Sequence, residues 1–211
     1  PFTVSADGSH VAEYYTRDVA GNVEAVRSRA FQIDSRAPES AAGLTGTMGD
    51  HQVAVLIARQ NLAIEAPVLS DVAPLSGLLL PLLPRFAGKV RFMRDPTRGG
   101  VGVTLNEMAS AANARFVLDE ARLPVRESVR GVCEILGFDP LYLANEGKAV
   151  LIVAGDAAEA IVTALREHPY GRETAIIGEV QEGGSGVRMR THSGGVRAVD
   201  YPVGDQLPRI C

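Results

Sequence analysis

The chain of 211 residues contains no tryptophan, only two cysteines, and aromatic residues at just 5% of its length. Two cysteines are too few for a disulfide framework or a thiolate metal cage, and the four scattered histidines show no zinc-ligand spacing. A net charge of −4 and the shortage of aromatic rings argue against a nucleic-acid partner. The low cysteine content is typical of a reducing compartment, and we expect a cytoplasmic protein.

Long hydrophobic runs are also absent, because no segment reaches the roughly 18 uncharged apolar residues of a membrane span. The most apolar stretch, residues 72–83, is interrupted by Pro74 and Pro81. We therefore expect no membrane partner. A signal peptide is missing as well, and the sequence opens with Pro1 rather than Met. A fragment, a processed product or an incomplete reading frame would each explain this opening, and an upstream targeting signal stays open.

Residues 1–38 have the pattern of short β-strands separated by tight turns. Asp7-Gly8 and Gly21-Asn22 separate extended runs, and such residues tolerate the positive φ of hairpin turns. The stretch DGSHVAEYYTRDVAGNVE, followed by IDSRAP, resembles the end of an immunoglobulin-like module of bacterial surface and secreted proteins. We interpret residues 1–38 as a partial β-sandwich fragment.

The rest of the chain predicts an α/β (α+β) domain over residues 49–198. Residues 39–48 are small and polar and are interpreted as a junction, and residues 199–211 as a flexible tail without periodicity. Helices are expected to alternate with strands between these limits. The helices are expected at 50–62, 72–83, 101–112, 127–136 and 157–166, and the strands at 90–93, 115–118, 149–153, 175–180 and 187–190.

The loop of residues 94–100 has the composition of an anion-binding turn between a strand and a helix. Gly99 and Gly100 allow close backbone approach, and the following helix start offers unpaired N–H groups to a phosphate. Asp95 could bind a metal and Arg98 a phosphate. A plain strand-to-helix turn capped by Asp95 or Thr97 explains the same residues.

Two further polar stretches are candidates. Asp50 and His51 open a predicted helix, where Asp50 would serve as a cap and His51 would orient a substrate or donate a proton. Asn145 and Glu146 come just before a buried strand, where a carboxylate can act as a base. Turn chemistry alone also accounts for Asn and Gly at such a place, so both interpretations stay open.

The two cysteines differ in their setting. Cys133 lies in a predicted helix with apolar neighbours and is expected to be a buried hydrophobe. Cys211 is the last residue printed, on a segment that contains Pro208 and Arg209. Extended residues after Asp200 could carry its thiol on the order of 40 Å. We expect Cys211 to be the reactive thiol, because thiolates form where solvent and positive charge are near.

In combination, these motifs resemble one family, the hydrogenase maturation factor HypE, or carbamoyl dehydratase. The resemblance covers about residues 40–211, and the ending Pro-Arg-Ile-Cys is its most specific part. The matching stretches, in order, are TGTMGDHQVAV, LSDVAPL, FMRDPTRGGVGVTLNEMA, CEILGFDPLYLANEGKAVLIVA, IIGEV and GGVRAVDYPVGDQLPRIC.

The resemblance implies the carboxy-terminal lobe of a PurM-like (AIR synthetase-like) fold and a role in nickel–iron hydrogenase maturation. In that role, ATP with Mg²⁺ drives dehydration of a carbamoyl group on Cys211 to a thiocyanate, and Glu146 acts as the base. The residues implied to face the nucleotide are Asp95, Thr97, Arg98, Gly99, Gly100 and Asn145. No residue of this chain is assigned as a metal ligand.

The resemblance also implies partners, and it shows that one lobe of the family has no counterpart here. A HypF-type carbamoyltransferase would load Cys211, a HypC–HypD scaffold would receive the cyano group, and the full-length family forms homodimers. The family's amino-terminal ATP lobe has no counterpart in this sequence, so turnover of ATP by this chain alone is not expected. The alternatives are a secreted immunoglobulin-like binding protein without catalysis and another PurM-like ATP-dependent synthetase.

Overall fold

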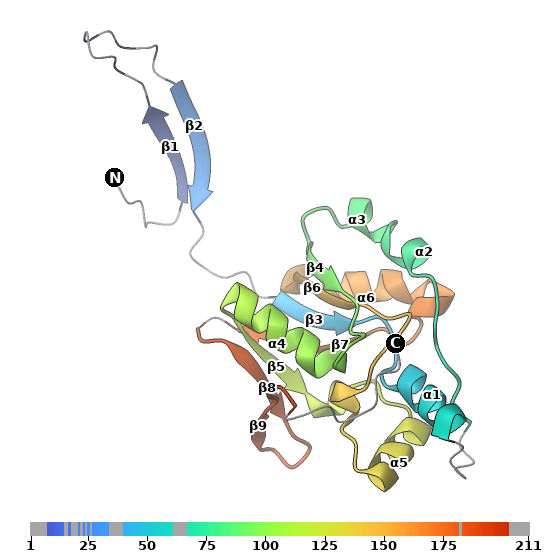
Figure 1. Ribbon diagram of the computed structural model, residues 1–211. Coiled ribbons are helices and arrows are strands. Elements are labelled where there is room, and N and C mark those ends of the chain that lie inside the picture. The colour runs from blue at the N-terminus through green and yellow to red at the C-terminus, as the bar shows by residue number, and fades with distance from the viewer. Residues whose placement is uncertain are drawn as a thin grey trace. The chain divides into compact units, whose positions relative to one another are not determined.

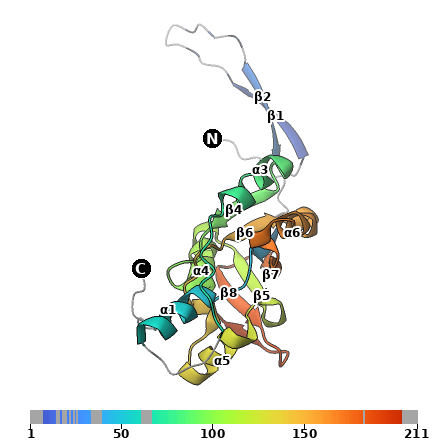
Figure 2. The same ribbon diagram turned by 90° about the vertical axis from the view of Figure 1, so that its right-hand side faces the viewer.

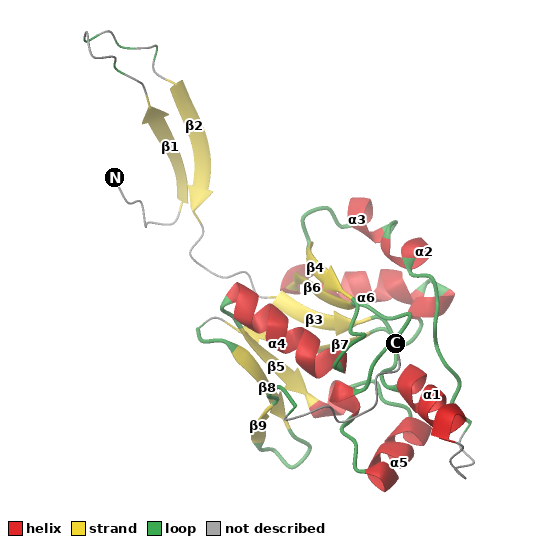
Figure 3. Cartoon of the chain, in the orientation of Figure 1, coloured by secondary structure: helices red, strands yellow, loops and turns green. Residues whose placement is uncertain are grey.

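The computed structural model describes residues 8–14, 17, 21, 23, 25, 27–33, 40–60, 67–181 and 183–202. The chain divides into two compact units, Pro1–Pro38 and Glu39–Cys211. Figure 1 shows the elements in chain order, and Figure 3 separates helices, strands and loops.

The first unit contains an antiparallel hairpin of β1 (Gly8–Tyr14) and β2 (Arg27–Ile33). Beyond the strands, Arg17 forms an antiparallel bridge with Val23, and Gly21 between them has φ of +91°. The second and third extended runs expected from the sequence therefore pair with each other through a turn that contains Gly21. The first expected run, before Asp7-Gly8, lies outside the described residues.

The second unit is built on a seven-stranded sheet in the order β4-β6-β3-β7-β5-β8-β9. Neighbouring strands are antiparallel except β5 and β8, which are parallel. The strands are β3 (Ser40–Leu44), β4 (Val90–Arg94), β5 (Arg115–Asp119), β6 (Val150–Ala154), β7 (Ala175–Gln181), β8 (Gly186–Arg190) and β9 (Val196–Ala198). The helices are α1 (Asp50–Gln60), α2 (Ser76–Leu79), α3 (Leu82–Arg85), α4 (Gly100–Ala112), α5 (Glu127–Leu136) and α6 (Ala158–Arg166), with short 3₁₀ turns η1 (Glu120–Arg122), η2 (Pro140–Tyr142), η3 (Gly155–Ala157) and η4 (Pro169–Gly171).

Helices cover both faces of this sheet, as the turned view in Figure 2 shows. Successive residues of a strand point to opposite faces, and β6 is buried on both. Val150 and Ile152 pack with α4 on one face, whereas Leu151 and Val153 pack with α2, α3 and α6 on the other. The apolar run predicted as a continuous buried strand is thus the middle layer of a three-layer α/β unit. A smaller core joins α1 to α5 through Val53, Val129 and Cys133, among others.

The predicted junction over residues 39–48 is wrong. Residues 40–44 form β3, a central strand that pairs with both β6 and β7, and its buried residues include Ala42 and Leu44. Small residues fit here because the strand is enclosed between two helical layers. Small residues are typical of linkers as well, so composition alone does not distinguish a linker from this strand.

Two other expectations need adjustment. The predicted helix over 72–83 is two short helices, α2 and α3, with Pro81 at the cap between them. The predicted tail over 199–211 begins too early, because Val199 is fully buried and its N–H donates to the carbonyl of Val187 at 2.9 Å. Each of the other predicted helices and strands matches an observed one within two residues at each end, and β9 has no counterpart among them.

Candidate functional site

The loop between β4 and α4 adopts the shape that its glycines allow. Gly99, with φ of +73°, precedes the first residue of α4, and no side chain caps that helix. Gly100, with φ of +65°, lies so close to η2 that a Cβ there would stand 2.5 Å from the carbonyl oxygens of Leu141 and Leu143. The glycines are therefore required by close backbone packing, and the α4 amino terminus keeps N–H groups free of a side-chain cap.

The polar residues of the same loop differ in their exposure and in their hydrogen-bond partners. The Thr97 hydroxyl is 2.8 Å from Oδ2 of Asp95 and 3.2 Å from the carbonyl of Asn145. Asp95 and Arg98 are exposed, and Arg98 makes no hydrogen bond or ion pair with other described residues. Arg98 is thus available to an anionic ligand, and Thr97 links this loop to the stretch before β6.

Asn145 connects three segments that are far apart in the sequence. Its Oδ1 accepts a hydrogen bond from the backbone N–H of Gly49 at 2.8 Å, and its Nδ2 donates to the carbonyls of Leu143 and Pro96 at 2.9 and 3.3 Å. Its own N–H donates to the carbonyl of Pro96 at 3.2 Å. Asn145 is 1% exposed, so the amide is a buried connector. We call Gly49, Pro96, Thr97 and Asn145 the Asn145 cluster.

The two candidates at the start of α1, Asp50 and His51, differ in burial and in the groups that they contact. Asp50 is the first helical residue, and its carboxylate is buried without a hydrogen-bond partner among the described residues. Oδ1 lies 3.4 Å from a guanidinium nitrogen of Arg126. Burial raises the pKa of Asp50, and the nearby Thr47 hydroxyl and the charge of Arg126 oppose that rise. His51 is half-buried, with Nδ1 2.9 Å from the Ser70 hydroxyl.

Glu146 follows Asn145 directly and is half-buried. Its carboxylate makes no hydrogen bond or ion pair with any described residue, whereas the residues on both sides are fixed. Asn145 is held as above, and Gly147, with φ of +67°, packs against the backbone of residues 71–73. A carboxylate that is held in place by its neighbours and has no partner of its own can accept a proton from a ligand.

Two residues beside Glu146 were not predicted from the sequence. The Lys148 ammonium lies 2.6 Å from Oδ2 of Asp71, and both side chains are mostly buried. Lys148 belongs to the predicted Asn-Glu-Gly-Lys stretch, and Asp71 to the LSDVAPL motif. Both residues lie in stretches that the sequence singles out, but nothing in the sequence indicates that residues 77 positions apart form a pair.

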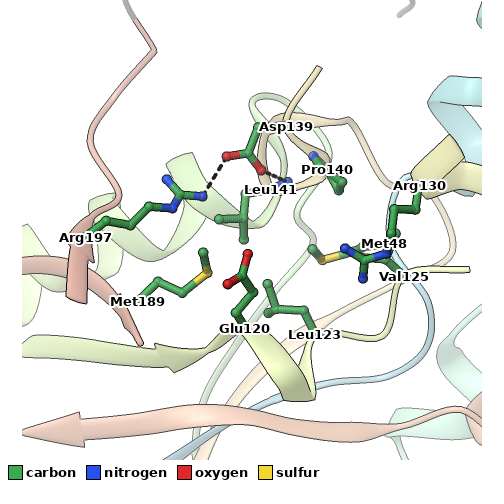
Figure 4. A pocket seen from close by; sticks show the side chains of 10 residues that line it. All are labelled: Met48, Glu120, Leu123, Val125, Arg130, Asp139, Pro140, Leu141, Met189 and Arg197. Carbon is green, nitrogen blue, oxygen red and sulfur yellow. Dashed lines mark hydrogen bonds and ion pairs between the residues drawn. The ribbon is translucent and has the colours of Figure 1, made fainter. Parts of the chain in front are cut away.

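None of the predicted site residues lines the pocket that the described residues form beside η2. That pocket, shown in Figure 4, lies between η1, η2, α5, β8 and β9. The Arg197 guanidinium donates to Oδ2 of Asp139 at 2.8 Å, and Oδ1 of Asp139 accepts from the N–H of Leu141 at 3.0 Å. We call this the Arg197 pocket, and its lining residues are Met48, Glu120, Leu123, Val125, Arg130, Asp139, Pro140, Leu141, Met189 and Arg197.

The two cysteines are placed differently. Cys133 is buried in α5 and free, and burial raises the pKa of its thiol to about 11. This confirms the prediction that Cys133 is a buried hydrophobe. Cys211 lies outside the described residues, so its role stays a prediction.

Metal-binding clusters and membrane-spanning helices are both absent from the described residues. No group of three or more histidine, cysteine, aspartate or glutamate side chains there could hold a metal ion. Of the helices in the described ranges, none combines the length and apolarity needed to cross a membrane.

Comparison with known proteins identifies relatives. Residues 37–190 match the model of the AIR synthase related protein, C-terminal domain. The chain is 51% identical over 175 residues to the carbamoyl dehydratase HypE of Cupriavidus necator, covering 82% of this chain and 50% of that protein. The chain therefore spans about half the length of the curated relatives that it matches.

Comparison with solved structures finds the same kind of relative. A hydrogenase maturation protein HypE in complex with ATP is 43% identical with a TM-score of 0.77, covering 83% of this chain and 53% of that one. HypE in a HypE–HypF complex is 41% identical with a TM-score of 0.75, covering 79% and 54%. The α/β fold and the resemblance predicted from the motifs are confirmed, and the alternative of a secreted binding protein gains no support.

Proposed function

The chain belongs to the AIR synthase related family, whose C-terminal domain covers residues 37–190, and from this premise we propose that it is the carboxy-terminal half of a hydrogenase-maturation carbamoyl dehydratase. In this role it supplies the acceptor thiol of Cys211, the base Glu146 and one wall of an ATP site. The observation that carries the proposal is the Asn145 cluster, in which the 94–100 loop, the start of α1 and the residue next to Glu146 are joined by hydrogen bonds.

The chemistry assigned to Glu146 follows from the net reaction. Dehydrating a carbamoyl group on sulfur removes its oxygen and both nitrogen-bound protons and leaves a C≡N triple bond. ATP supplies the activation that turns the oxygen into a leaving group. A carboxylate beside the nitrogen takes one of the two protons as the C–N bond gains order, the other proton passes to solvent, and the oxygen leaves as phosphate. Glu146 suits this task because its carboxylate oxygens make no hydrogen bond or ion pair with any described residue.

The ATP wall is assigned to the loop before α4. Uncapped N–H groups at the start of a helix and an unpaired guanidinium attract phosphate oxygens. Gly99, Gly100 and Arg98 provide these groups, while Thr97 and Asn145 hold the loop in place. Asp95, Asp50 and His51 remain further candidates for this site, although the Asp50 side chain is fully buried. The described residues do not fit a complete magnesium site, so no step is assigned to Mg²⁺.

The partners follow as part of the same proposal. A HypF-type carbamoyltransferase loads the thiol, and the solved HypE–HypF complex of a relative supports this assignment. A HypC–HypD scaffold receives the product, the full-length protein is a homodimer, and the compartment is the cytoplasm. These last assignments rest on the family resemblance and on the low cysteine content.

The acceptor role is tested by mass spectrometry after incubation of the chain with a HypF-type enzyme and its carbamoyl donor. We expect one carbamoyl group on the peptide that ends in Cys211, and none after Cys211→Ala. Cys133→Ala is the matched control and should still be loaded, because the buried thiol with a pKa of about 11 is almost entirely protonated at neutral pH. A carbamoyl group found on Cys133, or on neither cysteine, would contradict the proposal.

Binding of ATP is tested by calorimetry on the same chain. Only one wall is present, so we expect magnesium–ATP to bind weakly or not at all. Adding the remaining half of the Cupriavidus necator relative should raise the affinity, because charge-compensating groups are then supplied. Micromolar affinity of the chain alone would show that this wall suffices.

A further inference from the structure

The ion pair between Asp71 and Lys148 differs from the other ion pairs of the described residues. Its side chains are 14% and 8% exposed, whereas in each other pair at least one side chain is more than 30% exposed. Burying both charges costs solvation that an apolar pair of similar volume would not lose. Stability alone therefore gives little reason for this pair, and its location is informative.

Lys148 lies against the first residues after β3. A Cβ added to Gly46 would stand 2.7 Å from Cε of Lys148, so the lysine stem crosses the position where a side chain would be. The ammonium then reaches Oδ2 of Asp71 at 2.6 Å. The lysine is thus fixed along its length, by packing at the stem and by charge at the head.

Gly147 joins the same contact through its backbone. A Cβ there would lie 2.5 Å from the carbonyl oxygen of Asp71 and from the amide nitrogen of Ala73. The backbone of residues 71–73 therefore packs directly on the turn that follows Glu146. Ser70, next to this stretch, reaches His51 at 2.9 Å. The segment of residues 67–75 touches the candidate site at three separate points.

Glu146 stands between two anchors. On one side, Asn145 is hydrogen-bonded to Gly49, Pro96 and Leu143. On the other side, Gly147 and Lys148 are held by the segment 67–75. Between them, the Glu146 carboxylate has no partner among the described residues. This arrangement fixes the backbone of a residue while leaving its reactive group free.

We propose that Asp71 and Lys148 are positioning residues for Glu146, because their ion pair locks the Glu146–Gly147 turn against the segment 67–75. The assignment deepens the proposed function and rests on it, since Glu146 is the base there. Neither residue needs to touch the substrate. Loss of the pair frees the turn and misplaces the carboxylate, and small misplacements of a reacting group lower rates strongly.

The first experiment measures hydrogen exchange by mass spectrometry on the full chain. In Asp71→Asn and in Lys148→Met, amides of residues 67–75 and 145–148 should exchange at least about tenfold faster, with α4 and β6 unchanged. The matched control is Arg85→Met, which breaks the exposed pair with Glu167 and should leave both segments unchanged. The double variant Asp71→Leu with Lys148→Met keeps the burial without charge, and it should fold and still exchange fast.

The second experiment measures water loss from carbamoylated Cys211 after the remaining half of the relative is supplied. Asp71→Asn should lower kcat by about 10- to 100-fold, with loading of Cys211 unchanged. Lys148→Arg keeps the charge and should retain more activity than Lys148→Met. A merely structural pair would not produce this separation between loading and water loss.

The two experiments separate the two proposals. Unchanged exchange at 145–148, or an equal rise throughout the chain, would overturn the positioning role. Normal water loss in Asp71→Asn would overturn it as well. If the wild-type assembly loads Cys211 but never loses water, the proposed function fails, while the exchange measurement still decides whether the pair holds the turn.

Discussion

The Asn145 side chain is buried and hydrogen-bonds to backbone groups, whereas in the Arg197 pocket the partly exposed side chains of Arg197 and Asp139 pair with each other. The Asn145 amide is 1% exposed, while the Arg197 and Asp139 side chains are 40% and 31% exposed. Water competes for the exposed pair and screens it, but it cannot replace the buried amide. The Asn145 cluster is therefore held more tightly than the Arg197–Asp139 pair.

The largest effect is expected at Gly100, where the Asn145 cluster meets η2. Gly100→Ala forces a Cβ against two carbonyl oxygens at a positive φ, and should lower the free energy of unfolding by about 3–5 kcal/mol. Urea denaturation measures this. Gly131→Ala is the matched control, because a Cβ there meets nothing within 4 Å and alanine favours the helix. Equal losses in both variants would show that the packing at Gly100 is looser than described.

The second largest effect is expected at the buried side-chain amide of Asn145. Asn145→Ala leaves the Gly49 N–H and the Leu143 carbonyl without their partner and removes one of the two donors to the Pro96 carbonyl, and it should cost about 2–4 kcal/mol in urea denaturation. Asn145→Asp keeps the oxygen that accepts from Gly49 and loses the two N–H donors. We therefore expect its loss in free energy of unfolding to differ from that of Asn145→Ala and to depend on pH. A cost below about 0.5 kcal/mol for the alanine variant would mean that the cluster is not held by this residue.

A smaller and pH-dependent effect is expected at Asp50. Burial raises its folded pKa above the ordinary 3.8, so folding favours the protonated form. The wild-type free energy of unfolding should therefore fall, relative to that of Asp50→Asn, as pH rises from about 3.8 through the folded pKa. Below that window the difference should be constant. Denaturation at a series of pH values measures it, and a difference that changes in the opposite direction would show that Thr47 and Arg126 together outweigh burial.

The smallest effect is expected in the Arg197 pocket. Arg197→Ala removes a partly exposed ion pair with Asp139, and should change the free energy of unfolding by less than about 1 kcal/mol. Added salt should shrink the difference further. A loss as large as that of Asn145→Ala would remove the contrast between the two regions.

The sequence indicated the candidate site in pieces. The glycine pair at 99–100, Asn145 before a buried strand and the helix start at Asp50 were each found from local composition, and the structure joins the three segments through Asn145. The Asp71–Lys148 pair was not found, because its members lie in different loops and only the packing of segment 67–75 on Gly147 brings them together. The assigned roles of Cys211 and Glu146 stay predictions that the experiments above address.

The elements with local signals could be predicted from the sequence. The helix α4 and the continuous apolar run of β6 depend on residue periods, which the chain carries without its fold. Only the tertiary structure decided where β3 belongs, because its small residues say nothing about a strand until two helical layers enclose them. It also decided that Lys148 meets Asp71, because that pairing depends on how two loops pack and not on any property of their own sequences.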